Sequence, residues 1–246
     1  MHIALLTDIH ANREALAACL DHAGRQGIER KIFLGDYVGY GADPEWAVDT
    51  VIREVERGAL ALRGNHDDAI LVGTSRMNSD AATAIAWTRP RLDATQRDFL
   101  AQLPLTIEQG DRLYVHASAH APQEWDYIID LYAASQSFAA TSARVTFCGH
   151  THIPALFHVS ATGKFAHFEP TERVDIPLTP HRRWLAVIGS VGQPRDHNPA
   201  ACYGILDDEH NSLTYVRVPY DVDSAARKIR DAGLPIGLSH RLHIGY

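Results

Sequence analysis

The sequence predicts an α/β protein, and two observations carry that prediction. In the first 65 of 246 residues, short apolar runs alternate with helical patterns in the order strand, helix, strand, helix, strand, which is typical of a parallel sheet covered by helices. From residue 153 onward, short alternating runs separated by turn residues take over. These predict antiparallel strands that form a second layer rather than an independent domain.

Composition narrows the class of protein. Hydrophobic residues make up 46% and charged residues 22% of the chain, as in ordinary globular proteins. The net charge of −7 without a run of like charges argues against a nucleic-acid surface. No apolar stretch approaches the roughly 20 residues of a membrane span, and Asp8 comes too early for a signal sequence. Three scattered cysteines in apolar runs are typical of reduced thiols. We therefore expect a cytoplasmic protein without a membrane or stable nucleic-acid partner.

The N-terminal third is predicted as repeated units of one strand and one helix. Its strands are the apolar runs at residues 3–7, 31–34 and 59–62. Asn12 can cap the first helix, which Gly27 can end, and Asp43 can cap a second helix that begins at Pro44. Because a helix connects each strand to the next, the three strands should be parallel and end at one edge of the sheet.

The rest of the chain is expected to complete a single domain spanning residues 1–246. Residues 67–103 predict a helical, cap-like insertion with two helices separated by Pro90. Helices are also predicted at residues 130–140 and, as the final element, at 221–232. The further predicted strands lie at residues 105–107, 112–115, 144–148, 155–159, 165–168, 185–188, 202–206 and 213–218.

Side chains with metal-binding chemistry follow the predicted strands. Seven candidates stand at strand ends, namely Asp8, His10, Asp36, Asn65, His116, His150 and His152. Ligands bind at the carboxyl ends of strands in open α/β sheets, so these side chains should converge. Carboxylate, amide and imidazole together suit Mn, Fe or Zn better than Mg or Ca. Two such ions about 3.5–4 Å apart would share a bridging carboxylate and generate a hydroxide that attacks phosphorus in line.

The same residues carry a family resemblance. Five blocks resemble, in order, the motifs of the calcineurin-like metallophosphoesterase family: Asp8-x-His10, Gly35-Asp36, Gly64-Asn65-His66-Asp67, His116 and Gly149-His150-Thr151-His152. The remainder, including residues 189–195, is similar to the small bacterial and archaeal members, loosely called YfcE-like or diadenosine-tetraphosphatase-like. The resemblance implies a four-layer fold, a two-sheet β-sandwich flanked by helices, and a dinuclear metal-dependent phosphoesterase.

The resemblance also implies residue roles. The first metal would be held by Asp8, His10 and His152. The second would be held by Asn65, His116 and His150, with Asp36 bridging the two. His66 would protonate the leaving oxygen or stabilise its charge, and Asp67 would orient the His66 ring. The two divalent ions would be Mn, Fe or Zn, with Mg or Ni as further candidates.

Several residues have an ordinary structural interpretation beside the functional one. Asp8 and Asp36 could cap helices, and Asn65-His66 alone is a turn signal. His120 rivals His116 as the ligand after its strand, although the strand points to His116. Candidate substrate contacts are Arg195, Arg63 and Tyr40, with Tyr37 as a second aromatic flank. Each arginine could instead form a structural or surface salt bridge.

The expected substrate is a small phosphate ester, a phosphodiester or a nucleotide. Residues 38–41 lack the Asp-Arg pair of the family's protein Ser/Thr phosphatases, and Ala117 replaces a common glycine after the strand-end histidine. A phosphomonoesterase or protein phosphatase, or a non-catalytic scaffold with the same fold, are the alternatives. His66, which such scaffolds usually lose, is present. A DNA nuclease is disfavoured by the negative net charge.

Overall fold

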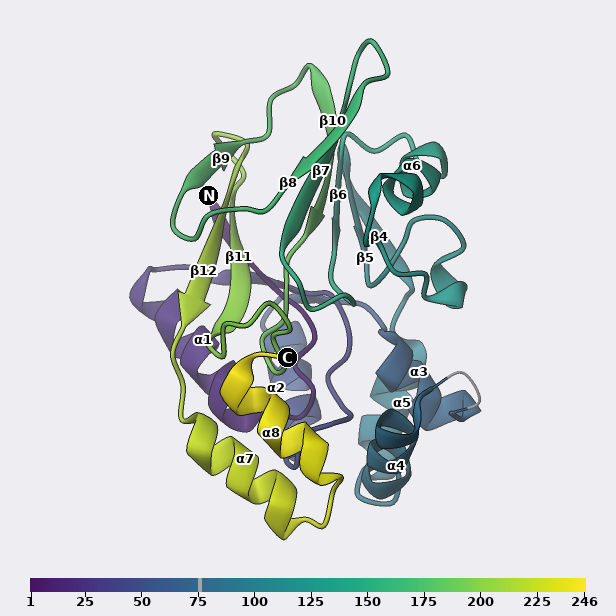
Figure 1. The fold of residues 1–246 in the computed structure, drawn as a ribbon, viewed down its shortest axis with the longest axis vertical. Helices are drawn as coiled ribbons and strands as arrows, with labels where there is room; N and C mark the ends of the chain where they lie inside the picture. The colour runs from purple at the N-terminus through teal and green to yellow at the C-terminus, as the bar shows by residue number, and fades with distance from the viewer. Residues whose placement is uncertain (75–76) are drawn as a thin grey trace.

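Two mixed β-sheets form the centre of the computed structural model, which describes residues 1–74 and 77–246. Each sheet has six strands within the described chain, and helices flank the pair (Figure 1). This is the two-sheet sandwich that the family resemblance implies. The first sheet has the strand order β3-β2-β1-β11-β12-β9 and the second β4-β5-β6-β10-β7-β8.

The first sheet contains the parallel core expected from the N-terminal sequence. Strand β2 pairs in parallel with both β1 and β3, and the remaining pairs are antiparallel. Its strands are β1 (His2–Leu6), β2 (Arg30–Phe33), β3 (Leu60–Ala61), β9 (Asp175–Pro177), β11 (Ala201–Asp207) and β12 (Ser212–Val218).

In the second sheet, β6 lies between β5 and β10 and is parallel to both, while the outer pairs are antiparallel. Its strands are β4 (Thr106–Gln109), β5 (Arg112–Val115), β6 (Val145–Cys148), β7 (Ala155–Ser160), β8 (Phe165–Phe168) and β10 (Arg182–Val187). In both sheets the parallel strands send their carboxyl ends toward the middle of the molecule (Figure 1).

Alternation of side chains along the strands builds two core layers. In β1, Ile3 and Leu5 pack into the core between the sheets, whereas Ala4 and Leu6 pack against α1 (Arg13–Arg25) and α2 (Pro44–Glu56), as the two-residue period of a strand requires. Helix α6 (Leu131–Ala139) places Phe138 in the layer on the outer side of the second sheet.

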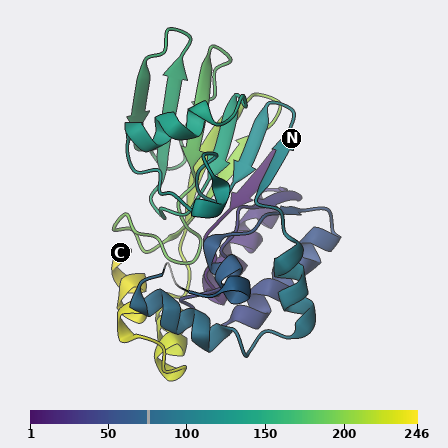
Figure 2. The ribbon, with the colours of Figure 1, turned by 90° about the vertical axis from the view of Figure 1, so that its right-hand side faces the viewer.

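The segment predicted as a cap contains three helices rather than two. They are α3 (Asn65–Val72), α4 (Ser79–Thr88) and α5 (Ala94–Gln102), and residues 75–76 between the first two lie outside the described residues. Leu100 of α5 packs into the core beneath the first sheet. Helix α4 packs instead on α7 (Val222–Asp231) and α8 (Ile236–Ile244), where the C-terminal helices lie beside it (Figure 2).

Four sequence expectations are corrected. The strands after residue 153 do not form one layer, because β7, β8 and β10 join the second sheet and β9, β11 and β12 the first. Strand β9 was not predicted; it has three residues and ends in proline. Helix α8 follows the helix expected to be last, and Gly237 near its start weakens its helical signal. Asp43 precedes α2 without a side-chain capping bond, because its carboxylate accepts a hydrogen bond from Lys228 Nζ at 2.7 Å.

Two smaller expectations, about the cap of α1 and the cysteines, hold. Asn12 Oδ1 caps α1 by accepting a hydrogen bond from the Ala15 amide, and the three cysteines are free and buried. Within the part of the chain that the structure describes, the helices are all too short or too polar to traverse a bilayer.

Candidate metal centre

The seven candidate ligands converge where the carboxyl ends of the strands meet. Asp8 follows β1, Asp36 follows β2, His116 follows β5, and His150 follows β6, while Asn65 begins α3 after the short β3. Five of the candidate ligands have positive φ angles between 49° and 68°, namely Asp8, His10, Asp36, His150 and His152. Such angles are uncommon for residues other than glycine and concentrate at functional sites, where surrounding contacts hold the strain.

The first group consists of Asp8, His10 and His152. The Nδ1–H of His10 donates to the Val38 carbonyl at 3.0 Å, and that of His152 donates to the Gln193 carbonyl at 2.6 Å. Each Nε2 atom therefore carries a lone pair in the neutral ring. The two Nε2 atoms nevertheless lie 3.1 Å apart, and Asp8 Oδ1 lies 3.3 Å from the Nε2 atom of His152. Three acceptors thus face one another.

The second group consists of Asn65, His116 and His150, whose candidate ligand atoms also face one another. His116 donates its Nδ1–H to the Leu34 carbonyl at 2.8 Å, which turns Nε2 inward. That nitrogen lies 3.1 Å from Asn65 Oδ1 and 3.2 Å from His150 Nδ1. The rival His120 is exposed, whereas His116 is fully buried.

Asp36 lies between the two groups. Its Oδ2 atom is 3.6 Å from His10 Nε2 and 3.4 Å from His116 Nε2, so one oxygen faces a nitrogen of each group. Its other oxygen accepts the His66 backbone N–H at 2.8 Å, which fixes the carboxylate. This is the position that a bridging ligand would need.

Burial and charge make the centre a candidate cation site. Burial opposes ionisation of Asp8, but His152 and His116 outweigh it and hold the pKa of Asp8 well below its usual range. Burial likewise opposes a charge on His116, yet Asp36 and Asp8 raise its pKa to about 9, and a metal ion bound at Nε2 would displace that proton. The buried atoms Asp8 Oδ1 and His150 Nε2 have no hydrogen-bond partner. Unpaired buried acceptors are costly, and divalent cations held by both groups would satisfy them.

His66 stands beside the candidate ligands. Its ring lies 4.7 Å from that of His10, edge to face, and 4.6 Å from that of Tyr40. Burial, the largest influence, lowers the pKa of His66 to about 4. The His66 ring packs against Gly39, where an added Cβ atom would lie 2.3 Å from His66 Nδ1.

The expectation that Asp67 orients the His66 ring is corrected. The Asp67 carboxylate accepts hydrogen bonds from the backbone N–H groups of Asp36, Tyr37 and Gly64 at 2.8–3.0 Å, and His66 Nδ1 has no partner. Burial and the nearby Asp36 raise the pKa of Asp67 to about 7 despite these donors. Asp67 therefore joins the Asp36 loop to the start of α3 instead of touching the His66 ring.

The candidate substrate contacts differ in position. An Arg195 Nη atom donates to Gln193 Oε1 at 3.0 Å and lies 3.4 Å from the Tyr40 hydroxyl. Burial is the main cause of the lowered pKa of His152, and the charge of Arg195 lowers it further. Arg63 instead pairs with Asp68 at 3.5 Å, which is the salt bridge weighed as its alternative. Tyr37 is a core residue whose hydroxyl donates to the Leu62 carbonyl at 2.6 Å, so it does not flank the site.

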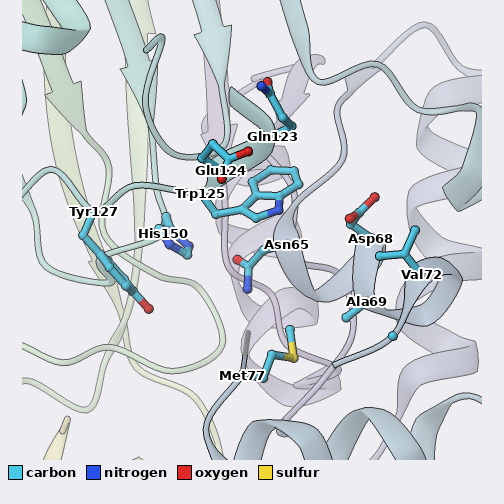
Figure 3. A pocket seen from close by; sticks show the side chains of 11 residues that line it. Asn65, Asp68, Ala69, Val72, Met77, Gln123, Glu124, Trp125, Tyr127 and His150 are labelled. Atoms are coloured by element: carbon cyan, nitrogen blue, oxygen red, sulfur yellow. The ribbon is translucent and has the colours of Figure 1, made fainter. Parts of the chain in front are cut away.

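Sequence reasoning missed two aromatic residues that contact the candidate ligands. The Tyr127 ring stacks on His150 with centroids 4.1 Å apart, and the Trp125 ring lies 5.9 Å from His116, edge to face. Both follow the short 3-10 helix η1 (Pro122–Glu124). They border a cavity of about 450 Å³ that opens on Asn65 and His150 (Figure 3). The loop from residue 117 to 129 lacks hydrophobic periodicity, and an aromatic pair alone is a weak signal.

Comparison with known proteins shows that this fold is that of a metallophosphoesterase. The model of the calcineurin-like phosphoesterase superfamily domain matches residues 1–211. The chain belongs to this superfamily. An uncharacterized protein from Methanocaldococcus jannaschii is 36% identical over 249 residues, covering 99% of this chain and 98% of the relative.

Solved structures show the same fold. A metallophosphoesterase from Sphaerobacter thermophilus has a TM-score of 0.87 and 33% identity, and the match covers 100% of this chain and 99% of that one. A hypothetical protein from Pyrococcus horikoshii has a TM-score of 0.78 and 19% identity, with coverage of 100% and 98%. The likeness therefore extends over the whole chain, the C-terminal helices included.

Proposed function

We propose that this protein is a dinuclear metal-dependent phosphoesterase that hydrolyses phosphodiester or nucleotide-type phosphate esters. The observation that carries the proposal is the pair of buried acceptor groups on either side of Asp36. One ligand atom from each of Asp8, His10 and His152 lies within 4.8 Å of the others, and the same holds for Asp36, His116 and His150. Facing lone pairs at such distances are repulsive unless a cation lies between them.

The donor set indicates which ions fit. In this proposal the first group holds one ion and the second group, with Asn65, holds the other, and Asp36 serves both. Imidazole with carboxylate suits Mn, Fe or Zn, and Mg or Ni also remain candidates. Divalent cations bound there would neutralise phosphate charge and supply a nucleophilic hydroxide from water at neutral pH.

The chain's own residues would do the rest. His66 lies against His10 and Tyr40, where its ring can hydrogen-bond the leaving oxygen and stabilise its developing charge. The guanidinium of Arg195 lies 5.7 Å from the centre of the Tyr40 ring and has an Nε without a partner. In this proposal it contacts a phosphate oxygen, which an arginine can do in bidentate fashion.

The substitution Asp36→Asn tests this function. The amide keeps the shape of the side chain but removes the charge that would serve both cations, so hydrolysis of bis-p-nitrophenyl phosphate with Mn should fall at least about 100-fold. EDTA should abolish the wild-type activity, and added Mn should restore it.

Asp98→Asn is the matched control, because this carboxylate is exposed on α5. It should leave the rate unchanged. Full activity in folded Asp36→Asn, checked by circular dichroism, would refute the proposal. A wild-type protein that binds Mn but hydrolyses no phosphate ester would favour the scaffold alternative.

A further inference from the structure

The position of the cavity beside the second ligand group points to a subsite for one part of the substrate. We infer that it receives a planar substituent of the phosphate, an aryl ring or a nucleobase, and this inference rests on the proposed function. Asn65 and His150 line the cavity and also belong to the second ligand group. A phosphate bound at that group would adjoin this space, into which its ester substituent can extend.

The two facing walls suit a flat ring. Trp125 and Tyr127 supply aromatic surface on one side, and their rings touch the candidate ligands His116 and His150. Ala69, Val72 and Met77 from α3 and the segment after it supply the facing apolar wall (Figure 3). A volume of about 450 Å³ is within the range of small-molecule sites. Aromatic stacking is strong for any base or aryl group, since each offers a π-face.

The backbone holds Trp125 in an unfavourable conformation. Trp125 has φ +61° and Ala121 has φ +46°, and these two residues bracket η1. A bulky residue in the left-handed region is strained, and such strain persists where surrounding contacts impose it, commonly at ligand sites. A strained turn in the backbone thus directs the indole of Trp125 toward the cavity.

Two phosphonates with the same metal-binding head test the subsite. Methylphosphonate and phenylphosphonate are titrated calorimetrically into the Mn-loaded protein, and bis-p-nitrophenyl phosphate hydrolysis is assayed in parallel. Phenylphosphonate should bind about 10-fold more tightly than methylphosphonate, because the ring gains stacking on Trp125.

Trp125→Ala should reduce the preference for phenyl to within about 2-fold, and Trp125→Phe should keep most of it. Methylphosphonate affinity should be unchanged in both variants, which shows that the metal centre is intact. Tyr132→Ala is the control, since that tyrosine is 74% exposed on α6 and does not line the cavity.

The two hypotheses fail differently. Wild-type protein that hydrolyses bis-p-nitrophenyl phosphate but binds methyl and phenyl phosphonates equally would leave the proposed function standing and overturn the subsite. Full retention of the phenyl preference in Trp125→Ala would overturn the subsite as well. Wild-type protein without Mn-dependent hydrolysis would refute the proposed function, and the subsite assignment with it.

Discussion

Hydrogen bonds to backbone carbonyls orient the rings of three histidines in this centre. His10, His116 and His152 each donate Nδ1–H to a carbonyl, of Val38, Leu34 and Gln193 respectively. Each ring is thereby fixed in orientation, with Nε2 turned inward toward the other candidate ligands. His150 differs, because its Nδ1 faces His116 and its Nε2 has no partner. The two histidines of the Gly149-His150-Thr151-His152 motif therefore enter the centre through different nitrogens.

At this scale, His150→Ala and His152→Ala should weaken different metal sites. His152 lies 3.3 Å from Asp8 Oδ1 in the first group, and His150 lies 3.2 Å from His116 Nε2 in the second. Each variant should retain about one Mn per chain with near-wild-type affinity and bind the other at least about 10-fold more weakly. Calorimetric Mn titration measures both steps.

His120→Ala, at an exposed position after the same strand as His116, should keep two unchanged binding steps. If His150→Ala and His152→Ala weaken the same step equally, the division of ligands into two groups is wrong.

At the scale of elements, the turns after the strands position the side chains, and glycines permit the close packing of these turns. Gly39 has φ +83°, and its Cα faces the His66 ring. At Gly149, a Cβ would lie 2.1 Å from Thr7 Oγ1 and 2.3 Å from Asp8 Oδ2. The Asp67 carboxylate then ties the β2 turn to the start of α3 through three backbone donors.

Gly39→Ala should therefore lower activity by displacing His66. The added methyl group would lie 2.3 Å from Nδ1, and positive φ strains alanine. We expect kcat for bis-p-nitrophenyl phosphate to fall at least about 10-fold, while Mn binding persists, since the backbone of Gly39 is not among the candidate ligands.

Gly24→Ala is the matched control, because that glycine lies inside α1 with nothing within 4 Å of the added Cβ. It should leave kcat unchanged and raise stability by up to about 1 kcal/mol. Unchanged kcat in Gly39→Ala would show that the position of His66 does not limit the reaction.

At the scale of the whole molecule, the C-terminal helices and the 67–103 segment brace the site from one side. Tyr40 shares a buried cluster with Ala81 and Ala84 of α4, Ile229 of α7, and Leu238 of α8. Tyr40 also touches His10 and His66. Through Tyr40, the packing among α4, α7 and α8 thus continues to the side chains of the candidate centre.

Leu238→Ala should destabilise the fold by about 2–5 kcal/mol, because its side chain is fully buried and would leave a cavity. Urea unfolding followed by circular dichroism measures the change. Ile236→Ala, at a position 55% exposed on the same helix, should cost less than about 1 kcal/mol. Equal stability of the two variants would show that α8 does not brace the fold.

The sequence alone determined the strand–helix order of the first 65 residues and named the seven side chains that the structure brings together. It could do so because strand-end residues of a parallel sheet share one edge whatever the rest of the chain does. Only the tertiary structure decided how later strands divide between two sheets, since alternation specifies a buried face and not a pairing partner. It also decided that Asp67 binds backbone amides, that Asp43 pairs with Lys228, and that Trp125 and Tyr127 border the ligands. These depend on contacts between segments distant in the chain, which no local pattern encodes.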